Sequence, residues 1–339
     1  MIGYAEKRLG ALILDNSTIH VIGAGEFGSS LAYAWRQAGR SVALWCRDPA
    51  QATSLRETGI NPKVPECPTM PGIRAGVLAN LALMSAKDVL VLAVKAQAQT
   101  GVFEALRDRI RPGNAVVTVS KGFADGRGTL LSTALGLPQG LGVLSGPSFS
   151  LDLFEDRPTA VTLATASPDA GLLAVLSTPR LRLYASTDTV GVQICGAMKN
   201  VIAIACGCSD GMGFGASARS ALMARGLREL ERVTEVYGGD PRTAVGLAGV
   251  GDLALTCQDQ QSRNYSFGHD LGRGQSALEL LSRGTTVEGA ATALSLIASG
   301  HTEGVSLPIT EAVARLSRGE GSPAEEVTTL LSRSLAADV

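Results

Sequence analysis

A lysine and an asparagine stand side by side in a segment that is otherwise apolar or small, Ile194–Gly207 (ICGAMKNVIAIACG). If this segment is a helix, the residues that share a face with Lys199 lie three, four and seven positions away. None is charged: Val192, Cys195, Gly196, Ile202, Ala203 and Cys206. The pattern predicts a helix buried on all sides. Its lysine either extends its ammonium group out of the core or acts as an acid or base of lowered pKa, and the mid-segment position favours the second.

A glycine-rich turn, GAGEFG (23–28), lies between an expected strand and an expected helix. In this context the pattern is a dinucleotide-binding fingerprint. Gly23 would make the turn, Gly25 would let a pyrophosphate approach the backbone, and Gly28 would let the helix pack on the strand. The free N–H groups at the helix start would bind the phosphates. An ordinary tight turn is the less favoured alternative.

The end of the second expected strand bears on the choice of dinucleotide. An acidic residue there binds the ribose 2′-hydroxyl of NAD, and an arginine accommodates the 2′-phosphate of NADP. Arg47 directly follows this strand, and Asp48 comes next. The order favours NADP, while Asp48 keeps NAD open.

The elements that must hold these residues fall into two groups. Apolar strand-like segments at 18–22, 88–94, 115–120, 142–146 and 159–165 are mostly separated by helical stretches. This alternation predicts an α/β fold with a parallel, doubly wound sheet of Rossmann type. After about Ser186 the pattern is helical throughout. We therefore expect a dinucleotide-binding domain over 1–187 and an all-helical substrate and catalytic domain over 188–339.

Length and composition narrow the possible functions. The chain has 339 residues, too many for one ordinary core. Its 30 Lys and Arg against 31 Asp and Glu give a net charge of −1, which argues against a nucleic-acid partner. The apolar run 9–14 is too short for a membrane span. Six cysteines, several in apolar runs, and three widely spaced histidines suggest buried reduced thiols and no metal site. We expect a soluble cytoplasmic protein without stable membrane insertion.

From Thr18 onward the chain resembles bacterial NAD(P)-dependent glycerol-3-phosphate dehydrogenases. The resemblance implies oxidation of sn-glycerol 3-phosphate to dihydroxyacetone phosphate, or the reverse reduction, which supplies glycerol 3-phosphate for glycerophospholipid synthesis. It also implies NAD or NADP as cofactor and a homodimer. It rests on eight motifs: VIGAGEFG (21–28), SKG (120–122), SGPSF (145–149), GAMKNVIAIACGCSDGMGFGASARSALMARG (196–226), GLAGVGDLALTC (246–257), QSRNYSFG (261–268), VEG (287–289) and PIT (308–310).

The resemblance also implies roles for single residues. Lys199 matches the catalytic lysine, the proton acceptor in the oxidative direction, with Lys121, Asn200 and Asp252 as its catalytic companions. Substrate-binding positions are Lys121, Gly146, Ser148, Lys199, Asp252, Ser262, Arg263 and Asn264. Cofactor-binding positions are Gly23, Gly25, Glu26, Phe27, Gly28, Arg47, Lys121, Ser150, Arg263, Thr286 and Glu288. The chain departs from the family pattern at Lys95, where proline is common, and over the first 17 residues, which have no clear counterpart.

The residue types fit such chemistry. Burial should lower the pKa of Lys199 and the cation at Lys121 should lower it further. An ionised Asp252 would oppose that shift, so we assign it to orientation. Asn200 can donate to a substrate oxygen or to a nearby backbone carbonyl. Arg263 offers a planar fork for phosphate, Asn264 adds amide donors, and Ser262 could cap a helix start.

Two other functions stay open at this level. A 2-hydroxyacid or ketopantoate-type reductase would share the two-domain arrangement and a lysine, and its carboxylate substrate would also suit Arg263. A nucleotide-binding sensor without turnover would explain the glycine turn, but not a desolvated lysine in the helical domain.

Overall fold

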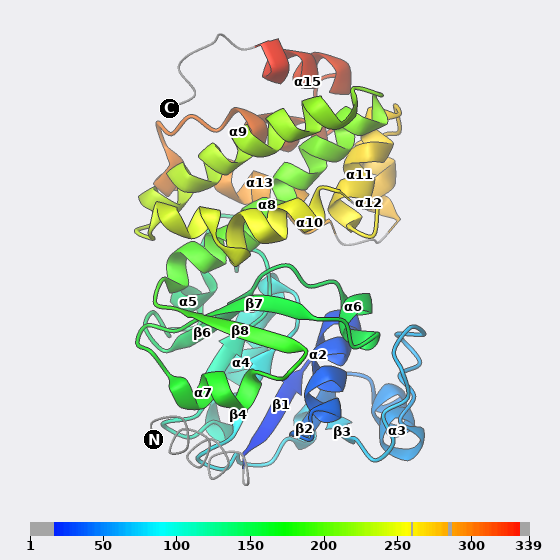
Figure 1. Ribbon diagram of the computed structural model, residues 1–339, viewed down its shortest axis with the longest axis vertical. Helices are drawn as coiled ribbons and strands as arrows, with labels where there is room; N and C mark the ends of the chain where they lie inside the picture. Colours follow the sequence, from blue (N-terminus) through cyan, green and yellow to red (C-terminus); the bar gives the residue numbers. More distant parts are fainter. Residues whose placement is uncertain (1–16, 259, 284–286, 333–339) are drawn as a thin grey trace. The chain divides into compact units, whose positions relative to one another are not determined.

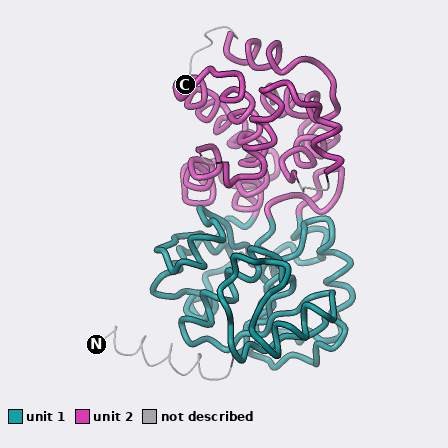
Figure 2. Tube along the Cα trace, turned by 90° about the vertical axis from the view of Figure 1, so that its right-hand side faces the viewer, with its two compact units in different colours: residues 1–120, 131–189 teal, residues 121–130, 190–339 magenta. Residues whose placement is uncertain are grey.

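The computed structural model describes residues 17–258, 260–283 and 287–332. The chain divides into two compact units, coloured separately in Figure 2. Unit 1 comprises residues 1–120 and 131–189, and unit 2 comprises residues 121–130 and 190–339. The division expected after residue 187 placed 121–130 in the first domain, but these residues pack with the second unit. Lys121 therefore belongs to the same unit as Lys199.

Unit 1 is built on one eight-stranded sheet with the order β3-β2-β1-β4-β5-β6-β7-β8 (Figure 1). The central strands are continuous apolar runs, as expected where helices cover both faces of a sheet. Each residue of VLVL in β4, for example, is buried. The strands are β1 (Thr18–Ile22), β2 (Ser41–Cys46), β3 (Arg74–Val77), β4 (Val89–Leu92), β5 (Ala115–Thr118), β6 (Leu141–Ser145), β7 (Thr159–Ala164) and β8 (Leu181–Ser186).

The expectation of a parallel sheet is wrong at one pair. β6 and β7 run antiparallel, whereas the other neighbouring strands are parallel. The segment between them holds only the five-residue helix α6 (Ser150–Phe154). Parallel neighbours are usually joined by a longer crossover helix. Instead of forming such a crossover, α6 packs against α2 (Glu26–Gln37).

The helices of unit 1 follow the strands as the sequence pattern predicts. Leu31 and Trp35 of α2 are fully buried in one cluster with Val21, Leu44 and Val91 of the sheet. Asp48 caps α3 by accepting from the backbone N–H of Ala50. The remaining helices are α3 (Pro49–Thr58), α4 (Gln99–Leu106), α5 (Leu131–Ala134) and α7 (Ala170–Leu176), with short 3-10 turns at Leu78–Asn80, Ala96–Ala98 and Arg107–Arg109.

The described residues of unit 2 form helices joined by turns and loops and contain no strand, as expected. Its long elements are α8 (Thr189–Gly211) and α9 (Gly215–Val236). The shorter helices are α10 (Asp252–Thr256), α11 (Arg263–Gly272), α12 (Ala277–Ser282), α13 (Glu288–Ile297), α14 (Pro308–Ser317) and α15 (Pro323–Ser332), with 3-10 turns at Pro241–Val245 and Gly300–Thr302 and a π-helical turn at Leu247–Gly251.

Helix α8 forms the core of unit 2. Its residues from 191 to 209 are buried, so the prediction of a helix without a solvated face is confirmed. The helix is long and apolar enough to cross a membrane, but 94% of its most apolar window is buried inside the structure. Its hydropathy is therefore that of a core helix.

Neighbouring helices approach α8 closely through glycines. A side chain at Gly268 of α11 would place its Cβ 2.0 Å from the carbonyl oxygen of Ile204. A Cβ at Gly289 of α13 would lie 2.4 Å from the carbonyl oxygen of Asn200. Both distances exclude a larger residue without movement of the backbone. This packing sets the start of α13 directly beside the turn of α8 that carries Lys199 and Asn200.

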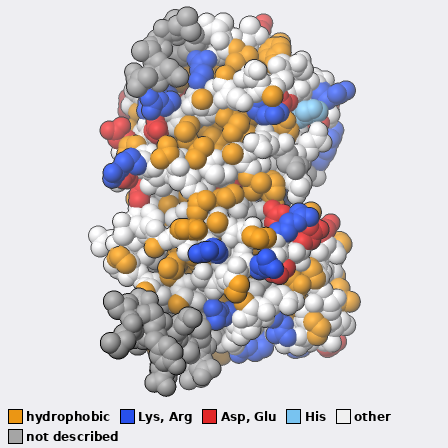
Figure 3. All heavy atoms as spheres, in the orientation of Figure 1, with side chains coloured by type: hydrophobic (Ala, Val, Ile, Leu, Met, Phe, Trp, Pro, Cys, Tyr) orange, Lys and Arg blue, Asp and Glu red, His pale blue; other side chains and the backbone are white. Residues whose placement is uncertain are grey.

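The surface carries both signs of charge. On the face seen in Figure 3, the Lys and Arg side chains of the described residues are interspersed with Asp and Glu. This distribution agrees with the near-zero net charge, so anion recognition has to be local.

Candidate active site

Lys199 lies in the middle of α8 with only 7% of its surface exposed. Its ammonium group does not extend to solvent. It donates to Asp252 Oδ1 at 2.5 Å and to Thr256 Oγ1 at 2.8 Å. A buried lysine requires such partners, because an unpaired charge in a core is strongly unfavourable.

Asp252 joins two lysines. Its carboxylate is fully buried, and while Oδ1 accepts from Lys199, Oδ2 accepts from Lys121 Nζ at 2.6 Å. The residue begins α10 directly after the π-helical turn Leu247–Gly251. Such turns are rare and frequently occur at functional sites. One turn later, Thr256 donates to the backbone carbonyl of Asp252 at 2.6 Å, which aims its oxygen at Lys199.

Lys121 is held by the segment 121–130, which is anchored on three helices of unit 2. Asn200 of α8 donates its amide to the carbonyl oxygen of Lys121 at 3.4 Å, one of the two roles expected for it. Tyr237, directly after α9, donates to the carbonyl oxygen of Gly128 at 3.0 Å. Ser295 of α13 donates to that of Asp125 at 3.0 Å. These contacts fix Lys121, whose side chain is 13% exposed.

The electrostatics of this cluster follow the expected directions. Burial lowers the pKa of Lys199 from its usual 10.5 to about 8. The carboxylate of Asp252 acts to raise it, and the cation at Lys121 acts to lower it. A lysine of this pKa is largely protonated at neutral pH, yet its neutral form is within easy reach. It can therefore donate a proton in one direction of a reaction and accept one in the other.

A second group of expected residues gathers at the starts of α11 and α13. Ser262 caps α11, its Oγ accepting from the backbone N–H of Tyr265 at 3.3 Å, so the capping prediction is confirmed. Arg263 is exposed at the first position of the helix. Asn264 accepts from the backbone N–H of Gly289 at 2.9 Å, beside Glu288. Because Gly289 packs against Asn200, this group lies close to the turn of α8 that bears Lys199.

The residues expected to hold a dinucleotide lie in unit 1. Gly23 adopts φ +114°, which favours glycine, and a Cβ there would lie 2.5 Å from the carbonyl oxygen of Ala93. A Cβ at Gly28 would lie 2.0 Å from the carbonyl oxygen of Gly23, so only glycine lets α2 start this close to the turn. Among the described residues beyond its chain neighbours, no heavy atom lies within 4 Å of a Cβ built at Gly25. Glu26 is exposed and Phe27 is half-buried.

Arg47 is exposed directly after β2, and its acidic neighbour is engaged elsewhere. Asp48 pairs with Lys63 at 2.7 Å and accepts from the N–H of Ala50 at 3.0 Å. The hydrogen bond from Lys63 is the largest cause of the lowered pKa of Asp48. Lys63 was not foreseen from the sequence and adds a second cation to this strand end.

Three further expected residues follow β6 in unit 1. Gly146 packs against the backbone of Val161 in β7, and Ser148 donates to the carbonyl oxygen of Gly146 at 3.0 Å. Ser150 begins α6, which packs against the helix that starts at the glycine turn. Thr286, expected to contact the cofactor, lies outside the described residues.

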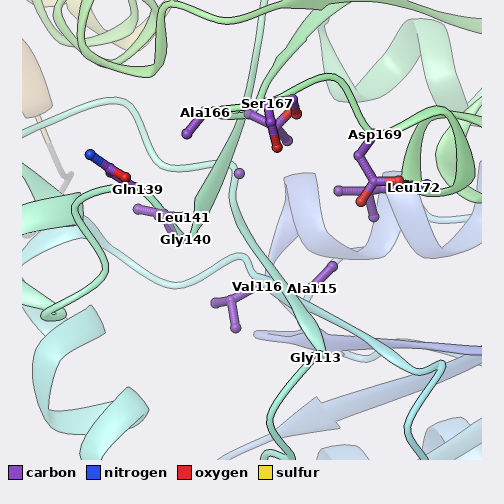
Figure 4. Close-up of a pocket in the computed structure, with 12 residues that line it drawn as sticks. Gly113, Ala115, Val116, Gln139, Gly140, Leu141, Ala166, Ser167, Asp169 and Leu172 are labelled. Carbon is purple, nitrogen blue, oxygen red and sulfur yellow. Dashed lines mark hydrogen bonds between the residues drawn. The ribbon is translucent and has the colours of Figure 1, made fainter.

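A cavity of about 170 Å³ in unit 1 is not part of this site. It lies at the amino ends of β5 and β6, with Gln139, Ser167 and Asp169 as its main polar side chains (Figure 4). Open α/β sheets bind ligands at the carboxyl ends of their strands, the opposite edge. Asp169 is already engaged in capping α7.

The two halves of the chain match two family models. Residues 18–171 match the N-terminal model of NAD-dependent glycerol-3-phosphate dehydrogenase, and residues 188–328 match the C-terminal one. The chain belongs to the NAD-dependent glycerol-3-phosphate dehydrogenase family. A glycerol-3-phosphate dehydrogenase [NAD(P)+] of Methylobacterium radiotolerans is 43% identical to it over 94% of this chain and 97% of the relative. The glycerol-3-phosphate dehydrogenase [NAD(P)+] of Halorhodospira halophila is 40% identical, again over 94% of this chain and 97% of the relative.

Solved structures agree with this membership. The crystal structure of glycerol-3-phosphate dehydrogenase from Coxiella burnetii superimposes with a TM-score of 0.84 at 33% identity, covering 93% of this chain and 99% of that one. A D-mandelate dehydrogenase in complex with NADH reaches 0.60 at 14% identity, covering 92% of this chain and 99% of that one, which shows a shared fold alone.

An NAD(P)-dependent dehydrogenase needs a phosphate cradle, and the glycine turn fits one. The open space over Gly25 would admit the pyrophosphate, and the first N–H groups of α2 would donate to it. Arg47 and Lys63 stand where the adenosine ribose is expected. Sequence reasoning missed Thr256, although its spacing of four from Asp252 would have placed both on one helical face.

Proposed function

We propose that this protein interconverts sn-glycerol 3-phosphate and dihydroxyacetone phosphate by hydride transfer with NAD(P), and so supplies glycerol 3-phosphate for glycerophospholipid synthesis. The buried Lys199–Asp252–Lys121 cluster carries the proposal, since it holds a lysine of pKa about 8. Membership of the family and the two relatives named above support the substrate. When bound, the nicotinamide supplies or accepts the hydride.

The protein's own part is to move the proton. In reduction, Lys199 as ammonium donates a proton to the C2 oxygen while the carbon receives the hydride. In oxidation, the neutral amine accepts the hydroxyl proton. Asp252 and Thr256 hold Nζ in place, so little reorganisation is needed in the transition state. With Asp252 ionised, two lysines and one carboxylate give the cluster a charge of +1 when Lys199 is protonated, which favours an anionic substrate.

Phosphate recognition falls to the start of α11. Arg263 is exposed there and offers a bidentate fork, while the helix start contributes free N–H groups. Asn264 is oriented by its bond with Gly289. Gly146 and Ser148 are further proposed substrate contacts. Ser150, Thr286 and Glu288 are proposed cofactor contacts.

We further propose a preference for NADP. Arg47 follows β2 at the expected 2′-phosphate position, and Asp48 is held by Lys63 and by α3 rather than by this arginine. A cytoplasmic homodimer is also proposed, following the family resemblance. Sedimentation of the purified protein tests the oligomeric state.

One assay tests the main proposal. The purified protein is given dihydroxyacetone phosphate with NADPH or NADH, with ketopantoate and unphosphorylated dihydroxyacetone as matched substrates. We expect rapid oxidation of the cofactor with dihydroxyacetone phosphate only. Turnover of ketopantoate instead would identify a ketoacid reductase, and cofactor binding without turnover of any substrate would identify a sensor.

A further inference from the structure

Gln99 is a buried polar residue to which the chemistry above gives no role. It begins α4 and is fully buried in unit 1. Its amide nitrogen lies 2.8 Å from Thr118 Oγ1 and 2.6 Å from Ser120 Oγ. The carbonyl oxygens of Leu92 and Val94 are both 3.5 Å away. One side chain thus ties the carboxyl end of β5 to the carboxyl end of β4.

Ser120 extends this connection to the turn after β4. Its hydroxyl donates to the carbonyl oxygen of Val94 at 2.5 Å, while its backbone N–H donates to Thr118 at 3.2 Å. We call Gln99, Thr118 and Ser120 the amide clamp. It fixes the peptide that joins Val94 to Lys95.

The clamped peptide borders the glycine turn. A Cβ at Gly23 would lie 2.5 Å from the carbonyl oxygen of Ala93 and 3.0 Å from Val94 Cγ1. β1 and β4 are neighbours, and the chain order reverses between them in the sequence β3-β2-β1-β4-β5. Dinucleotides bind at this reversal, outside the carboxyl ends of the strands. The clamp therefore lies directly behind one wall of the expected cofactor site.

Lys95, the residue after the clamped carbonyl, is exposed, and the clamp holds the peptide on its amino side. It has φ −51° and ψ 143°. Among the residues that the structure describes, its N–H donates no hydrogen bond. Its carbonyl oxygen accepts from the backbone N–H of Ala98 at 2.9 Å, so the following 3-10 turn holds its carboxyl side, and the clamp holds the peptide before it. Its φ lies within the range that a proline ring imposes.

The clamp also contains an unsatisfied group. Oε1 of Gln99 is buried and has no hydrogen-bond partner among the described residues. A buried acceptor without a donor is destabilising. A leucine would fill a similar volume without that cost, so packing alone does not explain the amide. What the amide adds is its donation to Thr118 and Ser120.

We propose that Gln99 is a positioning residue for the cofactor. Through Ser120 it holds the turn 93–95 against the glycine turn, in the shape that receives the nicotinamide half of the dinucleotide. The inference rests on the proposed function, since it concerns the cofactor of that reaction.

The first test measures cofactor binding without substrate. Dissociation constants of NADPH and NADH are determined by calorimetry for the wild type, Gln99→Leu and the control Gln97→Leu, whose side chain is exposed in the adjacent 3-10 turn Ala96–Ala98. We expect about tenfold weaker binding in Gln99→Leu, with the KM for dihydroxyacetone phosphate within about twofold of wild type, and no change in Gln97→Leu. Ser120→Ala should also weaken cofactor binding. If Gln99→Leu does not fold, the Ser120→Ala variant tests the proposal in its place.

The second test is a rescue. Proline at position 95 should fix the turn without the clamp, so Gln99→Leu/Lys95→Pro should recover cofactor affinity to within about threefold of wild type. The matched control Gln99→Leu/Lys95→Ala should not. Equal cofactor affinity in Gln99→Leu and wild type would overturn the inference, as would equal recovery by alanine and proline. If the wild type itself bound neither dinucleotide, the proposed function would fail, and this inference with it.

Discussion

The two units present their functional groups in opposite ways. In unit 1 the groups expected to bind the dinucleotide are backbone or exposed, such as the open space over Gly25 and the exposed Arg47. In unit 2 the central groups are buried charges, with Lys199 at 7% exposure and Asp252 at 0%. Exposed groups bind by contact and change their pKa little, whereas buried charges have their pKa set by their neighbours. Under the proposed function, this difference would separate the residues that bind the cofactor from those that transfer the proton.

Removing Lys199 tests this separation most strongly. Lys199→Ala should lower kcat at least ~10²–10⁴-fold, the usual contribution of a general acid or base. Cofactor affinity should stay close to wild type, because the glycine turn belongs to the other unit. Initial rates and calorimetric titration with NADPH measure the two effects. Substantial activity with an unchanged pH profile would remove Lys199 from the mechanism.

The same contrast explains how far the sequence could predict the structure. The glycine turn is local, so its residue types and order predicted its shape, and the uniformly apolar surroundings of Lys199 predicted its burial. In the ion-pair network, Asp252 lies 53 positions from Lys199 and 131 positions from Lys121 in the sequence. The periodicity of a helix or strand does not extend over such separations. The family resemblance pointed to Lys121 and Asp252. The sequence pattern did not show that Lys121 and Lys199 share the carboxylate of Asp252, nor that Thr256 contacts Lys199. The antiparallel β7 was missed because an apolar run does not show strand direction.

Arg263 sharpens the comparison, because it is an exposed residue, proposed to bind phosphate, in the unit that holds the buried charges. Arg263→Ala should lower kcat/KM for dihydroxyacetone phosphate by about two decades, since charge-assisted hydrogen bonds contribute ~1.5–3 kcal/mol each. Activity with unphosphorylated dihydroxyacetone should change little. Steady-state kinetics with both substrates measures the ratio. Equal losses would show that Arg263 is not the phosphate clamp.

Arg47 provides the matching test in unit 1. Arg47→Ala should raise the dissociation constant of NADPH by about one to two decades and leave that of NADH nearly unchanged, since only NADPH carries the 2′-phosphate. Because the side chain is exposed, added salt should weaken the contact. Lys63→Ala serves as a comparison, since it removes a nearby cation without removing the arginine. Equal losses for both dinucleotides in Arg47→Ala would leave the NADP preference without support in this residue.

The smallest expected effect is a change in pH dependence, and it tests the buried charges most directly. Because the pKa of Lys199 is about 8, kcat/KM for reduction should fall as pH rises through about 8, as the ammonium is lost. For oxidation it should rise over the same interval, as the neutral amine forms. Lys121→Gln removes the cation that lowers this pKa, so both inflections should move to higher pH, by about one pH unit.

Asp252→Asn removes the carboxylate that raises the same pKa, so it should move both inflections to lower pH. Both variants should also lose activity, but a loss of activity would follow from any damage to the site. Displacements of the inflection in the pH profile in opposite directions require one titrating group that interacts with both Lys121 and Asp252. Displacement in the same direction, or none in either variant, would mean that the titrating group is not the lysine held between Asp252 and Thr256. The buried cluster would then orient the substrate without transferring the proton.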